Sequence, residues 1–438
     1  MKLKAKLFAL IPILFFSVSG GPYGLEEIVT SVGPINTLLL ILIIPIVWTI
    51  PECMVVAELS SNYPVQGGYY KWVQMSMGKF WGFMEGWWSI LYTLIDLSLY
   101  PILFTTYLKF FFPDLNFWQL YIIQLTVIWS SAFINILGIR IVGYALSFCT
   151  VFVLISFLLF VIFGMKFISF DFSPIFMSSK GFAETNLLFG ISLAFWNFIG
   201  WDNASTVLHE VDNPNHNYRI AMFITIPIIV MFYFFPLLVG LSINTDWQNW
   251  QFGQFSTIAK NINLPLLANI LSIGGMITCL GLFNSLLLSS TRIFSTMSED
   301  RLLPSVFSKI HSKYQTPYMA IIIAAILYSL LVLVDFQNLI IYDVFLYLMA
   351  ISLEAIALII LRKKTHADSS HFRIPFGNLG MYIVMIMLFA CIAVVIIGNL
   401  TCFMSPVKGT CMGLFMLLSG VPVYLFFLNR SNANENNN

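Results

Sequence analysis

Charge is what this sequence has least of. Only 9% of its 438 residues are charged, whereas 59% are hydrophobic, and the mean hydropathy is +0.88. A soluble globular domain carries about 25% charged residues, so the composition excludes that class and predicts an integral membrane protein in a lipid bilayer. The net charge of +1 points to neither an acidic nor a basic partner, and we expect no nucleic acid.

Histidine and cysteine are also scarce, and their placement disfavours catalysis and metal binding. All five histidines fall in segments predicted to lie outside the membrane, and the six cysteines form no closely spaced pair typical of a metal site. We therefore expect no metal, no cofactor and no enzymatic activity. Cys402 and Cys411 flank a predicted outer loop, where a disulfide and two free thiols remain alternatives.

Long apolar runs fill most of the chain. Twelve stretches reach the roughly 20 residues that a helix needs to cross a bilayer. The polar loops between them are short, so we expect a single membrane domain over residues 1–438 with a disordered polar tail at 431–438. The predicted spans are 6–32, 36–58, 80–108, 118–137, 140–165, 185–208, 218–242, 264–296, 317–334, 339–362, 378–399 and 409–428.

The distribution of basic residues predicts the orientation. If the N-terminus is cytoplasmic, sixteen of the 21 lysines and arginines face the cytoplasm, and the positive-inside rule favours that arrangement. Both termini are then cytoplasmic, and we expect a plasma-membrane protein. The N-terminal lysines and the apolar run after them also imitate a signal peptide, but cleavage would leave an odd number of spans.

Two of the predicted spans are interrupted near their middles. The first break contains Ser-Gly-Gly-Pro-Tyr-Gly at 19–24, and the second follows Trp196. A broken helix leaves backbone groups unpaired, which is costly in hydrocarbon unless the break lines a cavity. Because the breaks lie five spans apart, they predict two inverted five-helix repeats, at about 6–165 and 185–362, and two extra helices at about 378–428.

Several short patches in order along the chain resemble one transporter family. The patches include residues 19–24, Ile50-Pro51-Glu52, Phe195-Trp196-Asn197, Trp201-Asp202, Asp300-Arg301-Leu302-Leu303-Pro304 and Arg373-Ile374-Pro375. Together they resemble the amino acid–polyamine–organocation superfamily, and most closely its branch of polyamine-uptake and amino-acid permeases. The resemblance implies a leucine-transporter-like fold, in which helices 1, 2, 6 and 7 move against a scaffold to give alternating access.

The first break suits an amino-acid carboxylate. Glycines let backbone N–H groups approach a ligand closely, and the following half-helix begins with partial positive charge and unpaired donors. The alternative is a proline–glycine kink whose backbone groups are satisfied by neighbouring helices. The candidate ligands are Ser19, Gly20, Gly21 and Gly24.

The second break suits an ammonium group. Its unwound carbonyls can accept hydrogen bonds from an amine, and a cation over an indole face gains roughly 0.5–2 kcal/mol. The alternatives are aromatic packing for the tryptophans and helix capping for the aspartate. The candidates are Phe195, Trp196, Asn197, Ile199, Trp201 and Asp202.

Carboxylates inside the predicted membrane region are functional by default. Glu26 and Glu27 either complement the helix dipole or bind an amine or a proton. Asp96 and Glu354 either bind a second amine, carry a proton or remain as buried protonated acids. The other acids in the spans include Glu52, Glu58 and Glu85, of which Glu58 and Glu85 are expected to be solvated or to brace loops.

The coupling ion is the least determined feature. Some proton-coupled relatives use a lysine in helix 5, but residues 142–163 contain none. A sodium site would use Ser289 and Ser290, although serines in helices commonly bond back to a carbonyl. We favour a carboxylate relay through Glu26, Glu27 or Glu354.

The sequence thus predicts a secondary active transporter of amino acids or polyamines, coupled to a cation, with a proton favoured. One alternative is a sodium-coupled permease for neutral amino acids. A second is a sensor that binds the same ligands without transport; the sequence contains no signalling domain that would favour it.

Overall fold

The computed structural model describes residues 6–167, 184–333, 339–364, 371–402 and 406–435. These residues form helices joined by short loops, with no strand among them. Eight helices within these ranges are long and apolar enough to cross a membrane, and three shorter apolar helices accompany them. The molecule is therefore all-helical, as the composition predicts.

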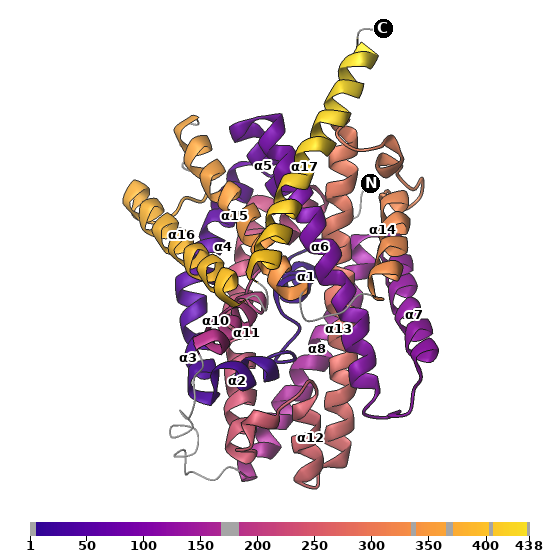
Figure 1. Ribbon diagram of the computed structural model, residues 1–438, viewed down its shortest axis with the longest axis vertical. Helices are drawn as coiled ribbons and strands as arrows, with labels where there is room; N and C mark the ends of the chain where they lie inside the picture. Colours follow the sequence, from indigo (N-terminus) through magenta and orange to yellow (C-terminus); the bar gives the residue numbers. More distant parts are fainter. Residues whose placement is uncertain (1–5, 168–183, 334–338, 365–370, 403–405, 436–438) are drawn as a thin grey trace.

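Among the described residues, the first half of the chain contains the first broken helix and four spans long enough to cross a membrane; Figure 1 shows them in indigo to magenta. Pro34–Asn62 is one span whose middle, η1, is a π-helix; such wide turns recur at functional sites. The elements are α1 (Leu7–Val18), α2 (Glu26–Val32), α3 (Pro34–Ile44), η1 (Pro45–Thr49), α4 (Ile50–Asn62), α5 (Gly68–Met77), α6 (Lys79–Leu108), α7 (Phe117–Ile136), α8 (Ile139–Gly164) and η2 (Met165–Phe167).

The second half begins with the second broken helix. Its last helix extends to Glu435, so it includes part of the tail at 431–438 that the composition predicts to be disordered. The elements are α10 (Glu184–Trp196), η3 (Asn203–Glu210), α11 (Pro214–Ile243), η4 (Trp247–Asn249), α12 (Gln254–Asn261), α13 (Pro265–Glu299), η5 (Ser305–Ser308), α14 (Tyr318–Leu331), α15 (Leu339–Lys364), α16 (Gly377–Cys402) and α17 (Pro406–Glu435).

Glycines with positive φ end the first half-helix. Gly21 and Gly24 both have φ of +96°, a conformation that costs other residues strain. A side chain on Gly21 would also lie 2.8 Å from Val153. The chain therefore leaves the helix between α1 and α2, where the sequence predicts the break.

The second break lies directly against the first. Gly200, between α10 and η3, has φ of +103°, and a Cβ on it would lie 2.4 Å from the carbonyl oxygen of Ser17. The half-helices pair in the same way, because α1 packs against η3 and α2 packs against α10. Both unwound segments thus meet in the middle of the bundle.

Two long helices hold the breaks in place. α6 and α13 pack along each other through the bundle (Figure 1), while α8 packs on α13 and α15 packs on α6. The described free cysteines are Cys53, Cys149, Cys279 and Cys391. The side chains of Cys402 and Cys411 lie outside the described residues, so the disulfide alternative stays open.

Candidate functional site

Two small cavities lie between the broken helices. One, of about 20 Å³, touches both breaks through Val18 and Gly200. The other, of about 30 Å³, lies beside the first break, and Trp196 and Tyr100 line both. A water molecule needs about 10–15 Å³ of such volume, so each cavity admits water but is too small for an amino acid. The molecule is therefore in a closed conformation around its centre.

Two buried aspartates, Asp96 and Asp343, line the 20 Å³ cavity. Asp96 on α6 accepts hydrogen bonds from the Tyr100 hydroxyl, at 2.9 Å to each oxygen, and from Trp196 Nε1 at 3.2 Å. Asp343 on α15 lies on the same wall and interacts electrostatically with Asp96. One Asp343 oxygen has no hydrogen-bond partner among the described residues.

Asp343 is a residue that the sequence analysis missed. Its signal was available: it is an acidic residue near the start of the apolar span at 339–362. What the sequence could not indicate is that α15 brings Asp343 to the cavity wall that Asp96 also lines.

The small residues of the first break occupy the other cavity. Ser19, Gly20 and Gly21 line it, whereas Gly24 lines neither. The Ser19 hydroxyl accepts from the Gly21 N–H at 3.0 Å, and the Gly20 carbonyl accepts from the Thr278 hydroxyl at 2.6 Å. Part of the backbone polarity exposed by the break is thus satisfied within the protein.

Glu26 and Glu27 are placed away from both cavities. Glu26 is fully buried, and its carboxylate accepts from the N–H groups of Gly24 at 2.8 Å and Gly253 at 3.3 Å. It therefore ties the first break to the loop before α12. The main-chain carbonyl of Glu27 accepts from the Thr30 and Ser31 hydroxyls, as the start of an ordinary helix would.

The residues of the second break serve mixed roles. Ile199 lines the 20 Å³ cavity and Asn197 the other. The Asn197 carbonyl accepts from the Tyr233 hydroxyl at 3.0 Å, so this break carbonyl is already engaged. Phe195 packs edge-on against Trp48 at 5.3 Å between ring centroids, which corresponds to the packing alternative.

Trp201 also follows the packing alternative. It is fully buried, its Nε1 donates to the Phe198 carbonyl at 3.0 Å, and it lines neither cavity. Its carbonyl accepts from the Tyr218 hydroxyl at 2.7 Å. Of the two predicted tryptophans, the structure therefore brings only Trp196 to the cavities.

Behind the 20 Å³ cavity lies a group of four buried acids, which we call the carboxyl cluster: Glu52, Glu85, Asp202 and Glu354. Asp202 makes no side-chain cap to η3. Instead, its carboxyl group interacts electrostatically with that of Glu354 and lies 2.6 Å from the Tyr347 hydroxyl. Tyr347 is itself a wall residue of the cavity, so it separates the cluster from the space between the breaks.

The two remaining expectations about acids have opposite outcomes. Glu58 braces a loop, as predicted: it pairs with Arg362 at 3.1 Å and accepts from the Ile374 N–H at 2.7 Å. The expectation of a solvated or loop-bracing Glu85 was wrong. Glu85 is 0% exposed, because α6 begins well before it and carries it into the bundle against α5 and α15.

Of the two predicted sodium ligands, Ser289 is engaged elsewhere, whereas the Ser290 hydroxyl has no hydrogen-bond partner among the described residues. Ser289 donates back to the Ser285 carbonyl at 3.2 Å, the usual behaviour of a helical serine. Ser290 is buried beside Tyr328. Neither serine lines the two cavities.

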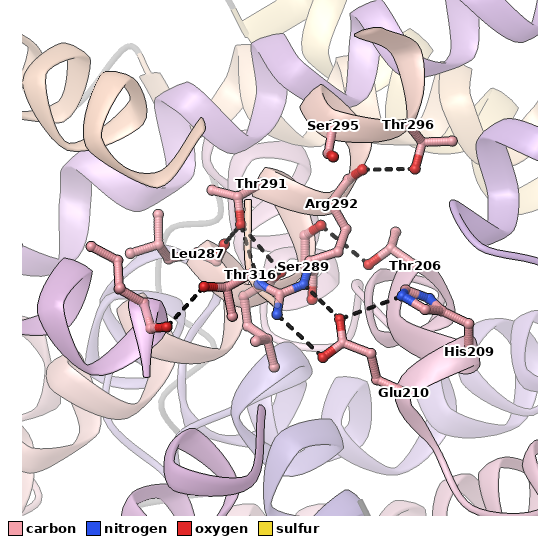
Figure 2. A network of polar contacts seen from close by, with 12 residues as sticks. Thr206, His209, Glu210, Leu287, Ser289, Thr291, Arg292, Ser295, Thr296 and Thr316 are labelled. Carbon is pink, nitrogen blue, oxygen red and sulfur yellow. Dashed lines mark hydrogen bonds and ion pairs between the residues drawn. The ribbon is translucent and has the colours of Figure 1, made fainter. Parts of the chain in front are cut away.

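The end of the second broken helix is fastened to α13. Figure 2 shows the Arg292 guanidinium facing the Glu210 carboxylate, with Nε–Oε1 at 3.0 Å and Nη2–Oε2 at 3.4 Å. His209 lies 3.7 Å from the same carboxylate. The Thr206 hydroxyl adds a bond to the Ser289 carbonyl at 3.1 Å. These contacts hold η3 in its closed position.

Comparison with known proteins gives a consistent result. The chain matches a family model described as amino acid permease over residues 13–427. It is 32% identical over 425 residues to a probable polyamine transporter of Arabidopsis thaliana, covering 96% of this chain and 83% of the relative. It is 34% identical over 384 residues to the polyamine transporter RMV1 of the same plant, covering 86% of this chain and 77% of that relative. It is 31% identical over 409 residues to the polyamine transporter PUT1 of Oryza sativa subsp. japonica, covering 90% of this chain and 75% of that relative.

Proposed function

Since the chain belongs to the amino acid permease family, and so is a multi-pass membrane transporter of amino acids or polyamines and not an enzyme, we propose that its substrate is a polyamine. The observation that carries this proposal is the pair Asp96 and Asp343 on the wall of one cavity. No lysine or arginine of the described ranges pairs with either. An ammonium group is the ligand that would neutralise them.

The first break gives less support to an amino-acid substrate. A bound carboxylate would need free N–H donors there. The N–H of Gly21 already donates to Ser19, and that of Gly24 already donates to Glu26. An amine-rich ligand needs acceptors and aromatic faces instead, and Trp196 supplies a face between the two cavities.

We propose alternating access in a twelve-helix architecture. The eight long spans, together with the broken pairs α1–α2 and α10–η3 and the shorter α14 and α17, would give twelve crossings. The mutual packing of the two breaks supports the inverted five-helix repeat. The basic residues support cytoplasmic termini in a plasma membrane.

Proton coupling is the favoured energy source. Many carboxyl groups are buried without a base, whereas the predicted sodium ligand Ser289 bonds to its own helix. A sodium-coupled permease for neutral amino acids and a non-transporting sensor remain the alternative functions, and the experiment below separates them.

The test is uptake by purified protein in proteoliposomes with an alkaline interior and no sodium. Labelled spermidine and putrescine are compared with arginine and leucine. We expect saturable polyamine uptake that collapses with the pH gradient. Uptake of leucine alone, or uptake that requires sodium, would overturn the proposal, and binding without flux would indicate a sensor.

A matched pair of variants tests whether the effect is specific to the aspartates of the cavity or follows from the loss of any negative charge. Asp343→Asn should lose most spermidine uptake, whereas Asp114→Asn makes the same change on an exposed loop and should not. Equal uptake by the two variants would contradict the role of the cavity aspartates.

A further inference from the structure

We propose that the coupling proton is bound in the carboxyl cluster, shared between Glu52 and Asp202 through the Tyr347 hydroxyl, and that it controls the hinge at Gly200. This inference rests on the proposed proton-coupled transport. It assigns the coupling proton to two carboxyl groups, those of Glu52 and Asp202, that line neither cavity, and it displaces Glu26 and Glu27 from that role.

The Tyr347 hydroxyl has too few hydrogen atoms to donate to both of its carboxyl neighbours. The Tyr347 hydroxyl lies 2.5 Å from Glu52 Oε1 and 2.6 Å from Asp202 Oδ1, and it accepts from the Gly200 N–H at 2.9 Å. A tyrosine hydroxyl has one hydrogen to donate. It can donate to one carboxylate only, so the other carboxyl group must be protonated and donate to the hydroxyl. The closed conformation therefore holds at least one proton at this bridge.

Asp202 and Glu354 are buried neighbours whose carboxyl groups interact electrostatically. Neither Glu354 oxygen has a hydrogen-bond partner among the described residues. A buried carboxylate beside a second carboxylate, with no donor to stabilise it, is strongly disfavoured. This gives an independent reason for a proton in the cluster.

Among the described residues, no ion pair joins a basic side chain to the carboxyl cluster. Glu52, Glu85 and Glu354 are each 0% exposed and Asp202 is 1% exposed, and neither Glu85 oxygen meets a donor of acceptable geometry in the described part of the chain. Four uncompensated buried carboxylates would repel one another strongly at low dielectric. The titratable groups that face the cluster from α4, α5, α6, α11 and α15 are uncharged thiols or phenols: Cys53, Tyr69, Tyr92, Tyr218 and Tyr347.

The bridge at Tyr347 also holds the backbone of the second break. Gly200 and Trp201, in the second break, give their N–H groups to Tyr347 and to Glu52 Oε1, the latter at 3.3 Å. The same break rests on the Ser17 carbonyl of the first. Loss of the shared proton would leave two negatively charged carboxylates, Glu52 and Asp202, on either side of the Tyr347 hydroxyl. Their repulsion would disturb the hydrogen bonds that hold Gly200 and Trp201, so we infer that deprotonation releases the closed arrangement of the two breaks.

The test measures proton movement and substrate exchange separately. Proteoliposomes carry a pH-sensitive dye, and labelled spermidine is followed in two modes: uptake driven by a pH gradient, and exchange against unlabelled spermidine at equal pH. Glu52→Gln keeps the side-chain volume, fixes a neutral group, and lies outside both cavities. We expect at least a fivefold loss of spermidine-coupled proton entry and a smaller loss of exchange, because Asp202 and Glu354 can still lose a proton and release the two breaks.

Glu26→Gln and Asp114→Asn serve as the matched controls and should keep their proton entry. Retained proton entry in Glu52→Gln, or its loss in Glu26→Gln, would overturn the assignment.

If the wild type transports a different substrate with protons, the polyamine proposal fails while the proton assignment is tested unchanged with that substrate. If it transports spermidine without protons, the assignment fails and the substrate proposal stands.

A second measurement does not depend on transport. Infrared spectra of the purified protein should show the carbonyl stretch of a protonated carboxyl group at neutral pH, and that band should weaken in Glu52→Gln and in Glu354→Gln. An unchanged band in both variants would overturn the proposal even if the variants transport poorly.

Discussion

Arg292 and Glu210 form a two-bond ion pair that joins the second broken helix to α13, with Nε–Oε1 at 3.0 Å and Nη2–Oε2 at 3.4 Å. The Arg292 side chain is 2% exposed and that of Glu210 is 16% exposed. The guanidinium also donates to the Leu288 carbonyl at 3.1 Å. The pair therefore ties the end of η3 to α13.

Breaking this pair from one side should destabilise the protein more than removing both charges. Glu210→Gln leaves the buried Arg292 without its charge partner, a loss of about 3–5 kcal/mol for buried pairs. Arg292→Met in the same chain should recover part of that loss. Thermal unfolding of the two single variants and the double variant in detergent measures the coupling; additive effects would contradict it.

Replacement of Gly200 should be far more damaging than replacement of a glycine with similar backbone. Gly200→Ala combines positive φ with a Cβ placed 2.4 Å from the Ser17 carbonyl oxygen. Gly78 has φ of +94°, and nothing lies within 4 Å of a Cβ there. Strain costs about 1–3 kcal/mol in both, but the clash applies only to Gly200. Yield of folded protein and spermidine uptake should fall sharply for Gly200→Ala, and equal effects of the two variants would argue against contact between the breaks.

The cavity aspartates should affect affinity for amines. A hydrogen bond to a charged group contributes about 1.5–3 kcal/mol, so Asp96→Asn and Asp343→Asn should each raise the spermidine KM by about tenfold or more. Initial rates of uptake over a range of spermidine concentrations measure this, with Asp114→Asn as the control. A fall in maximal rate with an unchanged KM would instead place these residues in the conformational step.

The ion pair of Lys71 and Asp300 should give an acid-sensitive contribution to stability. Burial raises the pKa of Asp300, but hydrogen bonds from Lys71, Tyr70 and Gln74 outweigh it, and the pKa is lowered overall. The Lys71 Nζ–Asp300 Oδ2 distance is 2.5 Å. Because the folded-state pKa lies below the unfolded value of about 3.9, the contribution is complete above that pH and is lost as the pH falls through the folded-state pKa.

The Asp300→Asn variant tests this sign. Its melting temperature should lie below that of wild type by a constant amount between pH 5 and pH 8, corresponding to about 1 kcal/mol for a partly exposed pair. The difference should shrink at pH values below about 4. A difference that grows on acidification would contradict the assignment.

The sequence by itself determined the membrane class, the family and the positions of the two breaks. These depend on composition and on local patterns, since apolar runs, prolines and positive-φ glycines act through the backbone beside them. The pattern at 19–24 predicted the end of α1 from residues next to one another in the chain. The same locality let the sequence identify Trp196 and Asp96 as candidates.

Only the tertiary structure decided which candidates meet. It joined Glu26 to Gly253 and withdrew Glu26 from the cavities, and it brought Asp343 to Asp96 and Tyr347 to Glu52. Each of these pairs comes from different helices far apart in the chain, and their meeting depends on the rotation and register with which those helices pack. Lipid and protein interior both select hydrophobic residues, so the sequence of an apolar span does not distinguish its lipid-facing side from its buried side. The sequence therefore could not indicate which face of α15 carries its acids inward.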